Sequence, residues 1–246
     1  MIPNLRKILT IDMVPFFYHS NLTADTILEL DTDTSHHIAQ VLRMRSDMPL
    51  HLTDGAGTLI QATLQVVSKK SCTVRVEGRT HHERGGRTVS IAIAPVKNNS
   101  RFEWFLEKAT ELGVSHIIPI LTERTEKQRL RTDRLRQLAV AAMLQSQQVW
   151  LPQIEEPIAF DQLIGQWKNQ PLQRLIAHCQ NQVKNEIAQC SLTDAVGMLI
   201  GPEGDFTDNE IAQALVADFT PVQLGNTRLR TETAGVVAAA WLRLQQ

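Results

Sequence analysis

The stretch TVSIAIAPVKNNSRFEWFLEKATELGVSHIIPIL, residues 88–121, decides the fold of the longer part of this chain. Thr88–Val96 changes from alternating to continuous apolar side chains, and His116–Leu121 is a second apolar run. Both patterns are typical of strands. Between them, Ser100 followed by Glu103 three residues later predicts a capping box that begins a helix. A strand, a helix and a buried strand in succession predict a parallel sheet covered by helices.

The same alternation continues to the end of the chain. Gly113 is suited to the position that ends a helix, and Thr207 with Glu210 predicts a second capping box. The other expected elements are a helix at about 132–148, strands at 172–177, 195–200 and 219–224, and a final helix at 231–244. The predicted fold class is therefore α/β.

The first third of the chain has a different pattern. Between residues 16 and 76, short apolar stretches such as Pro49–Thr53 and Leu59–Val67 are separated by turn residues, most clearly Asp54–Gly57. One helical piece is expected around residues 36–43. This pattern predicts a small β-barrel ahead of the α/β domain, joined to it by the polar, glycine-containing residues 81–87.

Composition indicates an ordinary globular protein. The chain has 246 residues, of which 43% are hydrophobic and 21% charged. No apolar run reaches the roughly 20 residues that span a bilayer, and the first residues lack the layout of a secretory signal. Cys72, Cys179 and Cys190 have neither the even count of a disulfide framework nor C-x-x-C spacing. We therefore expect a cytoplasmic protein with free thiols, no membrane and no zinc site.

Two basic stretches stand out in a chain of net charge −1. Residues 69–87 hold six basic and two acidic residues, and residues 123–136 hold six basic and three acidic ones. Together they would suit the phosphates of a nucleic acid, with Arg75, Arg79, Arg129 and Arg131 as candidate RNA contacts. The alternative is a solvated surface without a partner.

Two glycine turns follow the last predicted strands. The chain lacks G-x-G-x-x-G after the first strand of this domain and lacks the P-loop pattern. Instead, Ile200–Gly204 follows the strand at 195–200, and Leu224–Asn226 leads into Leu229–Thr233. Ligands of open α/β sheets bind outside the carboxyl ends of the strands, and glycine allows a flat ligand to approach the backbone. A plain turn is the alternative for each stretch taken alone.

These late stretches carry a resemblance to a known family. IGPEGDFTDNEI (200–211) and LGNTRLRTETA (224–234) resemble the carboxyl-terminal motifs of SPOUT methyltransferases, and more narrowly those of the RsmE family. That family transfers a methyl group from S-adenosylmethionine (SAM) to N3 of a uridine in 16S ribosomal RNA. Residues 102–120 and 37–57 resemble the family's first helix and strand and its PUA-like RNA-binding barrel.

The resemblance implies a fold and domain limits. The carboxyl-terminal parallel sheet would contain a deep trefoil knot, whereas general topology rules predict an unknotted sheet. Residues 13–80 would form the PUA-like barrel, 81–87 the linker and 88–246 the methyltransferase domain. Because Met13–Tyr18 resembles the family's usual start, residues 1–12 are predicted to be a dispensable extension.

The resemblance also implies a SAM site. The residues that match it are His178, Leu199, Ile200, Gly201, Gly204, Leu224, Gly225, Leu229 and Arg230. His178 has an alternative as a partly exposed loop histidine. The chain departs from the family where a second glycine commonly follows Gly204, since Asp205 stands there, and at Leu144–Gln148, where only Gln145 matches a common motif.

Methylation at N3 of uracil requires loss of a proton and a cation near O2 or O4 of the base. We expect Arg230 to be that cation, and Glu232 or Glu203 to position Arg230 or the polar end of SAM. A carboxylate at position 232 could instead stabilise the first turn of the last helix. The identity of the base stays open, and no metal is required. Arg43 and Arg45 are the RNA contacts that the resemblance implies in the barrel, or else surface arginines.

The last helix and the partners complete the predictions. Thr233–Leu242 carries no charged residue, so the helix is either buried within its own domain or pairs two copies in a homodimer, as the resemblance favours. The expected partner is 16S ribosomal RNA in the small ribosomal subunit. Two alternatives are a SPOUT enzyme with another RNA target and a non-catalytic ribosome-assembly factor.

Overall fold

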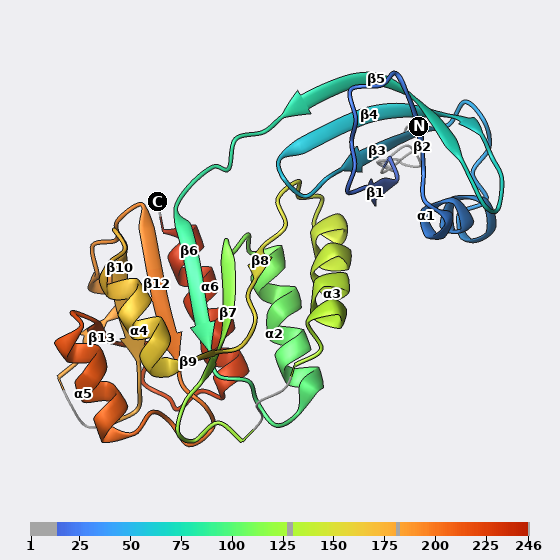
Figure 1. Ribbon diagram of the computed structural model, residues 1–246. Helices are drawn as coiled ribbons and strands as arrows, with labels where there is room; N and C mark the ends of the chain where they lie inside the picture. The colour runs from blue at the N-terminus through green and yellow to red at the C-terminus, as the bar shows by residue number, and fades with distance from the viewer. Residues whose placement is uncertain (1–13, 127–129, 181–182, 246) are drawn as a thin grey trace, which may run out of the picture. The chain divides into compact units, whose positions relative to one another are not determined.

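The computed structural model describes residues 14–126, 130–180 and 183–245, which form two compact units divided between Glu83 and Arg84 (Figure 1). The predicted extension at 1–12 lies outside these ranges, as does Arg129. None of the helices within the described ranges is long and apolar enough to cross a membrane.

The amino-terminal unit is built on a five-stranded sheet. Its order is β1 (Phe16–Tyr18), β3 (Pro49–Thr53), β4 (Thr58–Val66), β5 (Thr73–His81) and β2 (Ile27–Glu29). All neighbours are antiparallel except β1 and β3. The order ends on β1 and β2, so hydrogen bonds among the described strands do not close the predicted barrel. The helical piece is α1 (Thr32–His36), continued by the π-helix η1 (His37–Val41).

The core of this unit follows the alternation of its strands. Leu50 and Leu52 of β3 and Ile60 of β4 are fully buried beside Ile38 of η1. Strand β5 extends to His81, the first residue of the stretch predicted to be a linker.

The second unit is a parallel sheet, as predicted. The order is β11 (Asn185–Glu186), β13 (Thr220–Gln223), β10 (Gln173–Ala177), β12 (Ala195–Ile200), β6 (Thr88–Ile93), β7 (His116–Leu121) and β8 (Gln153–Ile154). Strand β9 (Ile158–Ala159) pairs with β7 off this path. Every neighbouring pair in this sheet is parallel, which confirms the α/β fold class.

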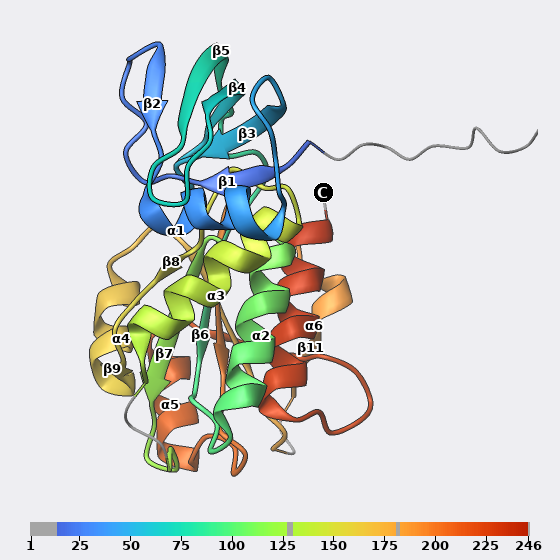
Figure 2. The same ribbon diagram turned by 90° about the vertical axis from the view of Figure 1, so that its right-hand side faces the viewer.

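Helices cover both faces of the sheet. On one face α3 (Thr132–Gln145), α2 (Asn99–Glu111) and α6 (Thr231–Leu244) lie side by side (Figure 2). On the other face lie α4 (Phe160–Lys168), which the sequence analysis did not predict, and α5 (Asp208–Val216). Each face has its own core, one around Phe105 and Ala239, the other around Phe206 and Trp167.

Helix ends correct one prediction and confirm two. The predicted capping box at Ser100 and Glu103 is wrong. Asn98 caps α2 by accepting from the Ser100 amide at 2.9 Å, and Glu103 accepts instead from Arg134 of α3 at 2.6 Å. Asparagine is among the best N-cap residues, so the N-cap lies two residues earlier than expected. The box at Thr207 and Glu210 is present, and Gly113 follows α2 at φ +77°.

Helix α6 packs its small residues against its own domain. Gly235, Ala238, Ala239 and Leu242, at helical spacing, are all buried. A Cβ on Gly235 would lie 2.7 Å from the Phe105 ring, so only glycine allows this approach of α6 to α2. Burial within the domain thus explains why α6 carries no charged residue at these positions.

The path into α6 determines where a site can form. Strand β13 lies beyond β10, and α5 lies on the face opposite α6. The segment 224–230 therefore crosses the carboxyl ends of β10 and β12 on its way to α6 (Figure 1). The trefoil knot itself stays a prediction.

Candidate active site

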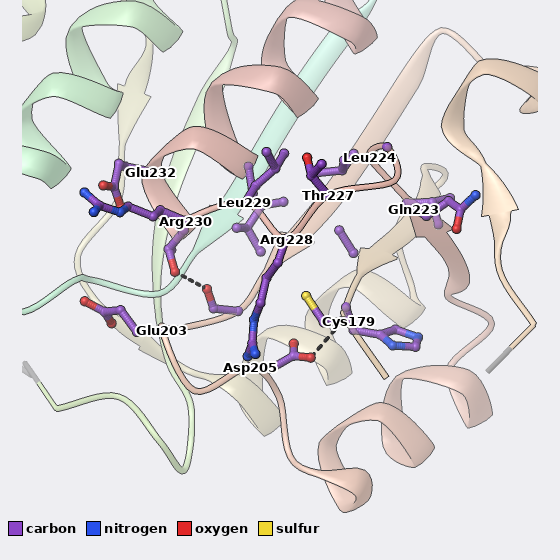
Figure 3. A pocket seen from close by; sticks show the side chains of 18 of the residues that line it. Cys179, Glu203, Asp205, Gln223, Leu224, Thr227, Arg228, Leu229, Arg230 and Glu232 are labelled. Atoms are coloured by element: carbon purple, nitrogen blue, oxygen red, sulfur yellow. Dashed lines mark hydrogen bonds between the residues drawn. The ribbon is translucent and has the colours of Figure 1, made fainter. Parts of the chain in front are cut away.

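A pocket of about 780 Å³ lies at the carboxyl ends of β10, β12 and β13 (Figure 3). Three segments enclose it: residues 177–179 after β10, residues 200–205 after β12, and residues 222–232 between β13 and α6. Its volume falls within the roughly 300–1,000 Å³ of small-molecule sites. The two predicted glycine turns thus meet in one cavity.

Most of the predicted site residues line this pocket. They are His178, Ile200, Gly201, Glu203, Leu224, Gly225, Leu229, Arg230 and Glu232. Leu199 does not line it, because neighbouring side chains of a strand point to opposite faces and Leu199 is fully buried in the α4–α5 core. Gly204 also lies outside the lining, where its carbonyl accepts from the Arg124 guanidinium at 2.6 Å.

The glycines of the two turns have different steric roles. Gly225 adopts φ +134°, a backbone conformation that other residues rarely adopt, and the space beside it is open. A Cβ on Gly201 would lie 3.1 Å from the Phe206 ring, so a side chain at this position would crowd that ring in the first turn. The hydroxyl of Thr231 donates to the Gly201 carbonyl at 3.0 Å and ties α6 to that turn.

Two buried polar side chains in the pocket have nitrogen or oxygen atoms without a hydrogen-bond partner among the described residues. His178 is 6% exposed, and neither ring nitrogen has a hydrogen bond. Burial, and secondarily the Lys184 ammonium, lowers the pKa of His178 below its usual value of 6.5. Glu232 is also 6% exposed, and its Oε2 has no partner. Because buried polar groups are normally hydrogen-bonded, both indicate a polar ligand.

Cations border these groups. Arg230 precedes the first residue of α6, is exposed, and has no side-chain hydrogen bond or ion pair with any described residue. Arg101 of α2 lies 3.7 Å from Glu232, measured from Nε to Oε1. Arg228 extends toward Asp205 (Figure 3). The pocket therefore combines apolar walls with carboxylates and guanidinium groups.

Sequence reasoning missed Arg101, Lys184, Asp205 and Arg228 as lining residues. Arg228 lies inside the LGNTRLRTETA motif, between Gly225 and Leu229, which were both assigned to the SAM site. This position could have identified Arg228 as a lining residue. Arg101 had none, since it enters the site only because α2 packs beside α6.

Hydrogen bonds join the first glycine turn, Ile200–Gly204, and the start of α5 to the loop after β7. Glu210, 5% exposed, accepts from the Glu123 amide through Oε1 and from the Thr207 amide through Oε2, both at 2.8 Å. Together with the bond from Arg124 to Gly204, this fixes the loop after β7 to the loop after β12. Arg124, one of the basic stretch at 123–136, thus supports the pocket.

The arginines predicted to contact RNA differ in the contacts that their side chains make within the protein. Arg79 donates to the carbonyls of Leu22 and Thr23, and Arg75 pairs with Glu77 at 2.9 Å, although both arginines are exposed. Arg43, Arg45 and Arg131 are exposed as well. The first two lie beside the exposed apolar side chains Val41, Leu42 and Met48.

Two family models match the chain, one in each unit. Residues 84–243 match the model of the RNA methyltransferase domain, and residues 30–77 match that of the RNA methyltransferase PUA domain. A ribosomal RNA small subunit methyltransferase E from Synechocystis is 30% identical over 223 residues, covering 88% of this chain and 72% of the relative. A protein of the same name from Rickettsia conorii is 28% identical, covering 93% and 94%.

Solved structures agree over both units. A probable rRNA-methyltransferase from Porphyromonas gingivalis superposes with a TM-score of 0.86 at 38% identity, covering 94% of this chain and 99% of the other. A ribosomal RNA small subunit methyltransferase E from Neisseria gonorrhoeae, bound to SAM, gives 0.83 at 27% identity, covering 92% and 95%. The chain therefore belongs to the family of ribosomal RNA small subunit methyltransferase E, with an RNA methyltransferase domain preceded by a PUA domain.

Proposed function

We propose that this protein methylates N3 of a uridine in 16S ribosomal RNA of the small subunit, with SAM as methyl donor, in the cytoplasm. The observation that carries the proposal is the pocket between the two glycine turns, where the His178 ring and the Oε2 atom of Glu232 are buried without partners and the exposed Arg230 lines the opening. The names of the relatives and the SAM-bound Neisseria structure support the same assignment.

The residues present fit SAM. Ile200, Leu224 and Leu229 offer apolar contacts to an adenine ring, and Gly225 leaves room beside the backbone. The His178 ring and the Glu232 carboxylate supply buried hydrogen-bonding atoms for polar groups of the ligand. SAM supplies a methyl group on a positively charged sulfur, which a nucleophile displaces in line.

The protein's own contribution is positioning and charge. N3 of uracil gives up its proton to a base before or as it bonds to the methyl carbon. The negative charge left by that proton is shared with O2 and O4 until the N3–methyl bond forms and S-adenosylhomocysteine leaves. Arg230 stabilises that charge, because its guanidinium is unpaired and lies at the rim of the pocket. Glu232, held beside Arg101, orients the polar end of SAM.

RNA binding is proposed for arginines of both units. Arg43, Arg45, Arg75 and Arg79 would contact phosphates from the PUA domain, and Arg129 and Arg131 from the methyltransferase domain. Phosphate contacts of this kind give affinity without sequence readout. Selection of one uridine must therefore come from the shape of the RNA and from the pocket.

A homodimer is proposed through the outer side of α6. Val236, Val237 and Ala240 are only partly buried, although the helix carries no charged residue between 233 and 242. A two-fold contact would bring two such surfaces together. The buried stripe that includes Ala238 is not available for this contact.

Calorimetry with SAM and with S-adenosylhomocysteine tests ligand binding directly. The proposal predicts binding of both, with one site per chain, and loss of binding when Gly225→Val fills the open space. Gly165→Val, in the middle of α4 outside the pocket, is the control. Absence of binding by the unmodified protein would leave a non-catalytic role in ribosome assembly and overturn the proposal.

A further inference from the structure

Asp205 has a backbone conformation that is costly for its residue type. It adopts φ +63°, in the left-handed region, and its amide donates to the Pro202 carbonyl at 3.0 Å to close the first glycine turn. Aspartate is tolerated there better than most residues, but glycine adopts this conformation without strain. A non-glycine residue at this position needs a compensating contribution from its side chain.

The Asp205 carboxylate makes two backbone contacts. Its Oδ2 accepts from the Cys179 amide at 2.8 Å, drawn as a dashed line in Figure 3, and its Oδ1 accepts from the Phe206 amide at 2.9 Å. Cys179 belongs to the segment after β10, whereas Phe206 is fully buried in the α4–α5 core. One charged side chain thus joins the segment after β10 to the segment after β12, and both segments line the pocket.

The contact lies next to the unpartnered His178. Because Cys179 directly follows His178, fixing the Cys179 amide also limits where the His178 ring can lie. The carbonyl side of this segment is held separately, by Lys184 donating to His178 at 3.0 Å and to Gln180 at 2.7 Å. Within the described part of the chain, the Cys179 amide of this segment donates to the Asp205 carboxylate.

We propose that Asp205 is a positioning residue, whose carboxylate holds the segment after β10 at the distance from the first glycine turn that SAM binding requires. The inference rests on the proposed function of this pocket. Hydrogen bonds to a charged acceptor are stronger than those between neutral groups. Losing this link should therefore weaken SAM binding on the order of tenfold.

Asp205→Gly tests this, because glycine keeps the backbone conformation and removes only the carboxylate. We expect a SAM dissociation constant raised about tenfold, a KM for SAM that rises more than kcat falls, and faster exchange of the Cys179 amide hydrogen. Asp205→Asn keeps one oxygen that can accept from Cys179 and should recover part of the affinity.

Asp218→Gly is the matched control. Asp218 has φ +61° and is exposed after the end of α5, outside the pocket, so the same substitution in the same conformation should leave SAM binding unchanged. Equal affinity of Asp205→Gly and the unmodified protein would overturn the inference, as would equal losses in both glycine variants. Failure of the unmodified protein to bind SAM would overturn the proposed function instead.

Discussion

Glu232, in the first turn of α6, lies 3.7 Å from Arg101, in the first turn of α2, measured from Oε1 to Nε. The two residues are separated by 130 positions in the sequence and meet because α2 and α6 pack side by side. Arg101 forms an ion pair with one oxygen of this buried carboxylate, and the other oxygen is buried without a partner among the described residues. Because both residues line the pocket, we expect this pair to couple the helix layer to ligand binding.

Glu232→Gln should weaken SAM binding, because it removes the charge while keeping the shape of the side chain. Arg101→Ala should have a smaller effect alone, and the double variant should lose less than the sum of the two, since the residues are in contact. Calorimetry checks this. Glu103→Gln, two residues further along α2 and paired with Arg134 outside the pocket, is the control. Strictly additive effects would contradict the coupling.

The burial of the His178 ring predicts that the stability of the protein and its affinity for SAM depend on pH. Burial, followed by the Lys184 ammonium, lowers the pKa of its ring in the folded protein, so the unfolded chain takes up the proton first as pH falls. Above the ordinary pKa of 6.5, the neutral ring makes its full contribution to the stability of the folded protein. This contribution is lost as the pH falls below 6.5 toward the lowered pKa of His178 in the folded protein.

Thermal unfolding between pH 5 and 8 measures this loss. The melting temperature of the unmodified protein should fall more steeply below pH 6.5 than that of His178→Gln. His116, whose pKa is also lowered by burial, contributes to both curves and so does not obscure their difference. Identical curves for the two proteins would contradict the assignment.

The proposed RNA contacts predict a change in salt dependence. Arg45→Ala and Arg131→Ala each remove an exposed cation, so each should weaken RNA binding and reduce the slope of log affinity against log salt by about one. Filter binding at several salt concentrations measures the slope. Lys168→Ala, at the exposed end of α4, is the control, and an unchanged slope in both arginine variants would identify ordinary solvated surface.

The dimer prediction is tested on the outer side of α6. Val237→Glu should convert a dimer into a monomer with little loss of stability, because Val237 is only partly buried. Ala238→Glu should instead unfold the domain, since Ala238 is fully buried against its own sheet and a buried unpaired charge is severely destabilising. Sedimentation of the unmodified protein as a monomer at micromolar concentration would refute the dimer.

Local patterns predicted the five longer strands of the sheet, because each carries its own signal, whereas the two-residue strands β8, β9 and β11 were not predicted. Ala195–Ile200 and Thr231–Leu244 have the predicted bounds, and the capping box at Thr207 and Glu210 fixes the start of α5. Helix α4 was missed, since it is short and lacks a side-chain cap. The site needed tertiary information: Arg101 and the Asp205 contact with Cys179 depend on packing between segments that are distant in the sequence.

The central claim is tested most directly by incubating the protein and SAM with small ribosomal subunits from a strain that lacks the activity, then identifying the modified nucleoside. The account predicts 3-methyluridine at one position of 16S ribosomal RNA, and a single-turnover rate lower by on the order of 10²–10³ for Arg230→Ala, the usual cost of removing a well-placed charge stabiliser. A methyl group on another atom or another RNA, or no methyl transfer at all, would contradict it.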